Sequence, residues 1–287
     1  VQGVGIAGAA TVKALNHALE RPQGGAPDKP AVAIIKHADV RRMLFSMQAR
    51  VEAMRAVMLE TALQLDLSRM APDPQAREVA AQQAQFMLPL CKAFFSDTGF
   101  EVANLAVQVL GGYGYISDAG VEQYVRDIRV ASIYEGSNGI QAFDLVTRKL
   151  LADSGQAAWE FVRRVRMDLQ QYRDNESTRV IRDALTDAVA RLERVMETYL
   201  SLVKDQRRDA ETGASAYLQL LGRVASGWMW LRMSAIAQND TPLHRRKRAL
   251  AEFYACYLMP EVAALEQQAL VQAEWIDVLE DELLARS

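Results

Sequence analysis

The chain has 287 residues, of which 50% are hydrophobic and 24% are charged, and its formal net charge is −3. A net charge this small argues against nucleic acid or an anionic membrane as partners, and no apolar run approaches the roughly 20 residues of a membrane span. Cys91 and Cys256 stand in apolar helical patterns. We therefore expect reduced core cysteines rather than a disulfide, in an intracellular, cytoplasmic protein.

The first half of the chain is predicted to be helical, with clear breaks. In chain order, the expected helices lie at residues 4–19, from an N-cap at Asp39 to a break at 71–74, at 75–110, at 121–130 and from Ser137 to 150. Pro89 predicts a kink in the third helix, and Gly111 predicts its end. The one β-prone run, Ala31–Ile35, has prolines nearby and is expected to be an extended loop.

A small polar break at residues 152–156 is the expected boundary between two domains, residues 1–152 and residues 153–287. Four further helices are predicted beyond it, followed by a frayed acidic tail at 276–287. These helices are expected at residues 157–173, 178–210, 213–238 and 242–270. The predicted fold class is therefore all-α, with one helical bundle followed by another.

Glu135 is the residue best suited to chemistry. It stands alone in a Tyr-Glu-Gly-Ser turn after the apolar Val130 and Ile133, so we expect a carboxylate kept away from water. Such shelter suits a general base. Free N–H groups of the helix that begins near Ser137 would stabilise a developing negative oxygen. From the residues alone, an ordinary surface carboxylate in a turn remains the alternative.

Other candidate features have plain structural explanations. Gly111, Gly112 and Gly114 lack the preceding strand of a dinucleotide-binding fingerprint, so a helix stop accounts for them. An exposed salt bridge is the default for Arg21. The basic run at residues 244–248 begins a helix, which favours a solvated face over a nucleic-acid site. The three histidines show no ligand spacing, so no metal site is predicted.

The spacing of these residues resembles the C-terminal signature of the acyl-CoA dehydrogenases. The matching order is Gln108-x-x-Gly111-Gly112-x-Gly114, then Arg126-Asp127, then Ile133-Tyr134-Glu135-Gly136-Ser137-x-x-Ile140-Gln141. Upstream, the sequence ending at Arg21 is similar to the Ala-Leu-Glu-Arg helix end of that family. The resemblance covers residues 1–150. Residues 28–44 and the added helices beyond 150 are similar to the branch that includes the 3-methylmercaptopropionyl-CoA dehydrogenases.

This resemblance implies the family's C-terminal four-helix bundle, followed by an added helical domain. It also implies an FAD-dependent enzyme that oxidises an acyl-CoA thioester to the 2,3-enoyl-CoA. Glu135 matches the base that takes the α-proton while FAD accepts the β-hydride, and Tyr134 and Gly136 would line the thioester. The residues that match FAD-binding positions, commonly those serving a neighbouring subunit, are Arg21, Gln108, Gly111, Gly112 and Ser137.

Partners follow from the same resemblance: electron-transfer flavoprotein as the electron acceptor, and a homodimer or homotetramer. The family's N-terminal helical domain and flavin-covering β-domain are not in this sequence, so we expect the C-terminal portion of a longer enzyme. Alone, it should bind FAD weakly or not at all and turn over poorly. Two alternatives stay open: a helical oligomerisation module without activity of its own, and a flavoprotein that keeps the scaffold without dehydrogenation.

Overall fold

The computed structural model describes the chain from residue 1 to 278, with residues 27 and 204–206 left out. The described part is helical, and its single β pairing is an isolated bridge between Pro22 and Ala33. The predicted all-α fold is therefore confirmed. The β-prone run at residues 31–35 supplies one side of this bridge and leads into a 3-10 turn at Ile34–Lys36. None of the described helices is long and apolar enough to cross a membrane.

Three long helices form the first half of the molecule: α1 (Gln2–Glu20), α2 (Ala38–Met70) and α3 (Pro74–Leu110). α3 packs against both of the others. It begins where Asp73 accepts hydrogen bonds from two backbone N–H groups at 3.1 and 3.3 Å. It ends at Gly111, whose φ of 64° is left-handed and favours glycine.

The predicted N-cap at Asp39 is wrong. α2 begins at Ala38, and the capping position is His37. Asp39 lies in the first turn instead, where its negative charge stabilises the helix by interacting with the positive end of the helix dipole. There it accepts a hydrogen bond of 2.8 Å from Arg42.

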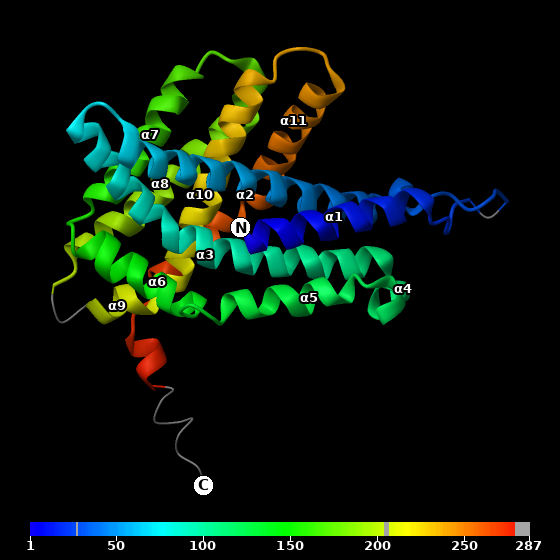
Figure 1. Ribbon diagram of the computed structural model, residues 1–287, viewed down its shortest axis with the longest axis horizontal. Coiled ribbons are helices and arrows are strands. Elements are labelled where there is room, and N and C mark those ends of the chain that lie inside the picture. Colours follow the sequence, from blue (N-terminus) through cyan, green and yellow to red (C-terminus); the bar gives the residue numbers. More distant parts are fainter. Residues whose placement is uncertain (27, 204–206, 279–287) are drawn as a thin grey trace, which may run out of the picture.

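Short helices follow α3, and two of them flank the predicted active-site turn. They are α4 (Gly112–Tyr115), α5 (Glu122–Arg129) and α6 (Asn138–Val146), with 3-10 turns at Ser117–Ala119 and Val130–Ser132 and a π turn at Thr147–Leu151. Both α5 and α6 pack against α3. The Glu135 turn, which we define as residues 133–137, joins α5 to α6 on one side of the bundle (Figure 1).

The second half consists of α7 (Gln156–Gln171), α8 (Arg179–Ser201), α9 (Arg207–Thr212), α10 (Ala214–Ile236), α11 (Pro242–Phe253) and α12 (Glu261–Ala269). The predicted single helix at 178–210 is wrong, because Leu202 adopts an extended conformation with ψ 130° and ends α8. A π turn at Tyr254–Leu258 interrupts the predicted helix at 242–270. Of the predicted tail, residues 279–287 lie outside the described part.

α10 lies at the centre of the fold. It packs against α2, α3 and α6 from the first half and against α8, α11 and α12 from the second. Trp230 on α10 is fully buried, and its indole N–H donates to the carbonyl of Ala49 on α2 at 3.2 Å. The buried hydrophobic residues of the two halves form one cluster. The division into domains at residue 152 stays a prediction, and the core is continuous across it.

Both cysteines are free thiols. Cys91 on α3 lies 3.3 Å from the Thr61 hydroxyl, and burial raises the pKa of its thiol to about 11. Cys256, in contrast, is exposed. The predicted core position of Cys256 is therefore wrong: the local apolar pattern belongs to the π turn, in which Tyr254, Ala255 and Leu258 are the buried residues.

Candidate active site

The backbone of the Glu135 turn is unusual. Glu135 has a φ of 54°, and the following Gly136 has a φ of 82°. Glycine adopts this left-handed region freely, whereas a residue with a side chain loses on the order of 1–3 kcal/mol there. A non-glycine residue held in such a conformation indicates a position where geometry serves function.

Glu135 is exposed in this chain. The apolar residues that precede it, Val130 and Ile133, are 53% and 58% exposed. The predicted shelter from water is therefore wrong for these residues by themselves. The physical reason is position: the turn lies at the edge of the bundle, and the two apolar side chains point outward instead of covering the carboxylate.

A hollow of about 420 Å³ lies beside the turn. Tyr134 and Glu135 line it, together with Gln2 of α1 and Lys92 of α3, and the Tyr134 hydroxyl donates a hydrogen bond to Gln2. Ser137 occupies the N-cap position of α6 without a side-chain capping bond. The first N–H groups of α6 therefore stay available beside the turn.

Polar side chains of α3 and α6 form hydrogen bonds that hold the Glu135 turn. The ammonium of Lys92 donates to the carbonyl oxygen of Gly136 at 2.7 Å and to the side-chain oxygen of Asn138 at 2.9 Å. The Asn138 amide in turn donates to Asp97 at 2.6 Å. Partial burial lowers the pKa of Lys92, although the charges of Asp97 and Glu135 oppose that shift. The ammonium of Lys92 therefore joins the Gly136 carbonyl, next to Glu135, to the side chain of Asn138.

A second pocket, of about 870 Å³, brings together four of the residues predicted to bind the cofactor. They are Arg21, Gln108, Gly111 and Gly112. Arg21 ends α1, and its carbonyl accepts a hydrogen bond of 2.8 Å from the N–H of Ile34. The default salt bridge is not found, because no ion pair among the described residues involves Arg21. Its guanidinium is therefore not neutralised by an acid of the described chain.

This second pocket, which we call the Arg21 pocket, suits a phosphate-bearing cofactor. A Cβ built on Gly111 or Gly112 would meet nothing within 4 Å, so the chain itself leaves space at both glycines. A guanidinium is a strong, bidentate donor to phosphate oxygens. His17 also lines the pocket, and burial, followed by the charge of Arg21, lowers the pKa of its imidazole.

The two groups of predicted residues lie far apart within one chain. Lys92 lines the hollow beside Glu135, and Gln108 lines the Arg21 pocket, sixteen positions further along α3. At the rise of an α-helix this separation is about 24 Å. α1 spans nearly the same distance, about 22 Å over the fifteen positions from Gln2 at the Glu135 turn to His17 at the Arg21 pocket; Figure 1 shows the course of α1. Ser137 lies with Glu135 and not with the other predicted cofactor residues.

The fold matches solved flavoenzyme and acyl-CoA structures. ACDH-11 of Caenorhabditis elegans in complex with C11-CoA matches with a TM-score of 0.80 at 17% identity, over 99% of this chain and 45% of that one. An acyl-CoA dehydrogenase complexed with FAD from Bacillus anthracis matches with a TM-score of 0.74 at 18% identity, over 99% of this chain and 50% of that one. The fold class is therefore that of a helical portion of acyl-CoA dehydrogenases.

Comparison of the sequence with known families narrows the assignment from a fold class to a family. Residues 1–151 match the family model of the acyl-CoA dehydrogenase C-terminal domain, and residues 161–275 match an acetyl-CoA dehydrogenase C-terminal-like model. The chain belongs to the acyl-CoA dehydrogenase family.

Two relatives are similar in sequence to most of this chain. The 3-methylmercaptopropionyl-CoA dehydrogenase of Ruegeria pomeroyi is 36% identical over 92% of this chain and 46% of its own length. A butyryl-CoA dehydrogenase of Syntrophomonas wolfei is 28% identical over 96% of this chain and 48% of its own length. The chain thus spans about half the length of these relatives.

Proposed function

We propose that this chain is the portion of an FAD-dependent acyl-CoA dehydrogenase that carries its catalytic base, Glu135. The observation that supports this most is the Glu135 turn: Glu135 has a left-handed backbone and lines a hollow, and the carbonyl of the next residue, Gly136, accepts a hydrogen bond from Lys92. Relatives named for dehydrogenation of acyl-CoA thioesters support the substrate class.

In the proposed reaction, the Glu135 carboxylate removes the proton from Cα of the thioester. The C–H electron pair forms the Cα=Cβ bond, and the hydrogen on Cβ leaves with its own electron pair. Bound flavin supplies the acceptor for that hydride. Negative charge builds on the thioester oxygen as the proton leaves, so nearby N–H donors are needed. The backbone of the turn and the first turn of α6 supply them, and Tyr134 and Gly136 flank the thioester.

The Arg21 pocket would hold the pyrophosphate and adenosine part of FAD through Arg21, Gln108, Gly111 and Gly112. Ser137 would contact the cofactor near the base. Because the Arg21 pocket and Glu135 lie about 24 Å apart along α3, we propose that the Arg21 pocket serves the active site of a neighbouring copy. The assembly would then be a homodimer or homotetramer. Electron-transfer flavoprotein is the proposed electron acceptor, and the cytoplasm is the proposed location.

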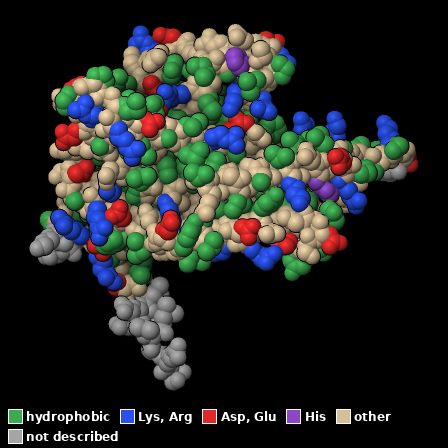
Figure 2. Space-filling model, viewed as in Figure 1, with side chains coloured by type: hydrophobic (Ala, Val, Ile, Leu, Met, Phe, Trp, Pro, Cys, Tyr) green, Lys and Arg blue, Asp and Glu red, His purple; other side chains and the backbone are tan. Residues whose placement is uncertain are grey.

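Exposed hydrophobic side chains support a larger assembly. They cover much of the middle of the face shown in Figure 2, where α1, α2 and α3 lie. On α2, Leu59, Leu63, Leu67 and Met70 recur at helical spacing and are between 38% and 80% exposed. Apolar patches of this kind mark surfaces that another protein surface covers. They also suit the alternative of an oligomerisation module, which measured activity separates from the enzyme.

Replacing Glu135 by Gln in the full-length protein tests the proposal. We expect kcat for α,β-dehydrogenation to fall by about 10²- to 10⁴-fold, the usual contribution of a general base, while flavin content and acyl-CoA binding persist. Glu160→Gln is the matched control, since Glu160 is on α7 and pairs with Arg163 there. Near wild-type turnover by Glu135→Gln would contradict the assignment of the base.

A further inference from the structure

α10 contacts α3 directly behind the Glu135 turn. The Gln219 amide on α10 donates to Asp97 on α3 at 3.0 Å. A Cβ built on Gly222 would lie 2.4 Å from the ring of Phe94, and the Arg223 guanidinium lies 5.4 Å above the same ring. Packing this close leaves little freedom. α10 therefore fixes the position of residues 94–97 of α3.

From Asp97, hydrogen bonds continue to the turn itself. The Asn138 amide donates to the other Asp97 oxygen at 2.6 Å, and Lys92 donates to Asn138 at 2.9 Å. Lys92 also donates to the carbonyl of Gly136, the residue that follows Glu135, at 2.7 Å. Four side chains thus connect α10 to the peptide next to the carboxylate.

Asp97 is the branch point of this network. It is half-buried, and burial raises the pKa of its carboxyl, while the hydrogen bond from Asn138 opposes that shift. A half-buried carboxylate requires its donors. Without the Gln219 amide, one Asp97 oxygen loses its partner, and the hydrogen bond from Asn138 is left to orient the carboxylate.

The Glu135 turn needs such support. A left-handed conformation at a residue with a side chain persists only where the surroundings impose it. The Glu135 carbonyl accepts a hydrogen bond from the Gln141 amide, which at 3.3 Å is long and weak. The charged bond from Lys92 to Gly136 is shorter and stronger.

We propose that Gln219 is a positioning residue, through which the second half of the chain holds the Glu135 turn in its reactive geometry by way of Asp97, Asn138 and Lys92. This inference rests on the proposed function. Gln219 acts through other residues and does not touch the reacting atoms. The added helices of this branch thereby contribute to proton removal at a distance.

The test is Gln219→Leu in the full-length protein, which removes the donor and keeps the approximate side-chain volume. A misplaced reactive group costs about tenfold or more in rate, so we expect kcat to fall about tenfold. KM for acyl-CoA and flavin content should change less than twofold. The isotope effect of α-deuterated substrate on kcat should rise, because proton removal becomes slower. Gln219→Lys, which retains a donor for Asp97, should restore most of kcat.

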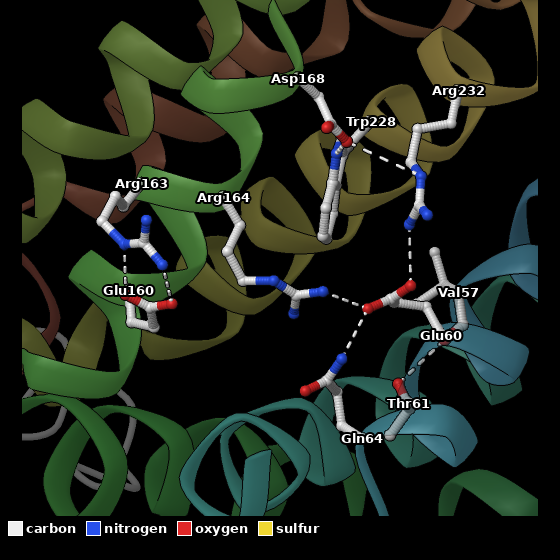
Figure 3. A network of polar contacts seen from close by, with 10 residues as sticks. All are labelled: Val57, Glu60, Thr61, Gln64, Glu160, Arg163, Arg164, Asp168, Trp228 and Arg232. Carbon is white, nitrogen blue, oxygen red and sulfur yellow. Dashed lines mark hydrogen bonds and ion pairs between the residues drawn. The ribbon is translucent and has the colours of Figure 1, made fainter. Parts of the chain in front are cut away.

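Arg232→Met is the matched control. Arg232 lies on the same helix and also crosses to the first half, where it donates to Glu60 on α2 at 2.8 Å, away from the turn (Figure 3). The Arg232→Met substitution should lower thermal stability and leave kcat and the isotope effect unchanged. In an Asn138→Ala background, Gln219→Leu should lower kcat no further, because both changes interrupt one network.

Two results would overturn this inference without touching the proposed function. The first is a Gln219→Leu enzyme with kcat within twofold of wild type, alongside an inactive Glu135→Gln enzyme. The second is a loss of kcat by Gln219→Leu equal to that caused by Arg232→Met. If Glu135→Gln kept its activity, the proposed function and this inference would both fail.

Discussion

At the level of single residues, Gly213 occupies a position where no side chain fits. A Cβ built there would lie 2.0 Å from the carbonyl oxygen of Ala269 and 2.2 Å from the hydroxyl of Tyr199. That hydroxyl donates to the same carbonyl at 2.6 Å, which ties α8 to the end of α12. The missing side chain therefore lets the start of α10 approach both helices.

We predict that Gly213→Ala lowers the free energy of unfolding by about 1–3 kcal/mol, the usual cost of overpacking. Chemical denaturation of the isolated chain measures it. Gly5→Ala is the control, since a Cβ on Gly5 meets nothing within 4 Å in the helix α1. That change should stabilise the chain by about 0.5–1 kcal/mol. Equal effects of the two substitutions would refute the steric explanation.

The sequence predicted a turn at Glu135, and the structure has one there, but the sequence reasoning missed the residues that brace the turn. Lys92 and Asp97 interrupt an otherwise apolar stretch of α3, and this is the one signal that the sequence offered. Gln219 shows no such signal, because its partner lies 122 positions away. The exposure of Glu135 was also missed, because apolar residues before it in the sequence, such as Val130 and Ile133, need not pack over its side chain.

At the level of helices, a buried carboxylate joins α2, α7 and α10. Glu60 is 8% exposed and accepts hydrogen bonds from Arg164 and, at 2.8 and 2.9 Å, from Arg232 and Gln64 (Figure 3). Burial raises the pKa of Glu60, but the hydrogen bonds and charges of the two arginines outweigh burial, and the pKa is lowered overall. The carboxylate thus stays charged between the three helices.

This lowered pKa predicts a stability that depends on pH. The contribution of Glu60 is fully present above the carboxyl's ordinary pKa of 4.5 and is lost as pH falls through the lower folded-state value. Glu60→Gln should cost about 1–3 kcal/mol near pH 7, because two arginines lose their counter-charge. It should also flatten the fall in unfolding free energy between about pH 5 and pH 3. If Glu60→Gln left the pH dependence of the unfolding free energy unchanged, the role of Glu60 would be contradicted. Glu197→Gln serves as the control, since Glu197 is exposed.

Helix boundaries were predicted well where proline or glycine marks them and poorly elsewhere. Residues 71–74 and Gly111 bound α3 as expected. Ser201 ends α8 without such a mark, because Leu202 and Val203 continue the apolar character of the helix. The π turns were not predicted either, because each is a single turn within a longer helical sequence.

At the level of the whole molecule, the sequence break near residue 152 does not mark a break in the core. Composition predicts a boundary from polar residues, but burial depends on which helices meet in space. Trp230 and Gly222 on α10 pack directly against α2 and α3. Such contacts join residues more than a hundred positions apart, and no local pattern encodes them.

We predict that the isolated chain binds FAD weakly and substoichiometrically. It offers the Arg21 pocket and the Glu135 turn about 24 Å apart, so neither alone supplies the contacts of a complete site. Flavin absorbance after purification and dialysis measures the bound fraction. Tight binding of one FAD per chain would sink this prediction, and an Arg21→Ala chain shows whether any residual binding belongs to the Arg21 pocket.

α1 and α3 run in the same direction, so the Glu135 turn and the Arg21 pocket lie at opposite ends of both helices, and this has a consequence for genetic complementation. If the base and the Arg21 pocket serve different active sites, two defective alleles should complement each other. A Glu135→Gln copy paired with an Arg21→Ala copy leaves one site with both intact partners. Random pairing makes half of the dimers mixed, so co-expression should recover about a quarter of wild-type activity, whereas each allele alone is inactive. Two lesions at the same end of α3 should never rescue one another.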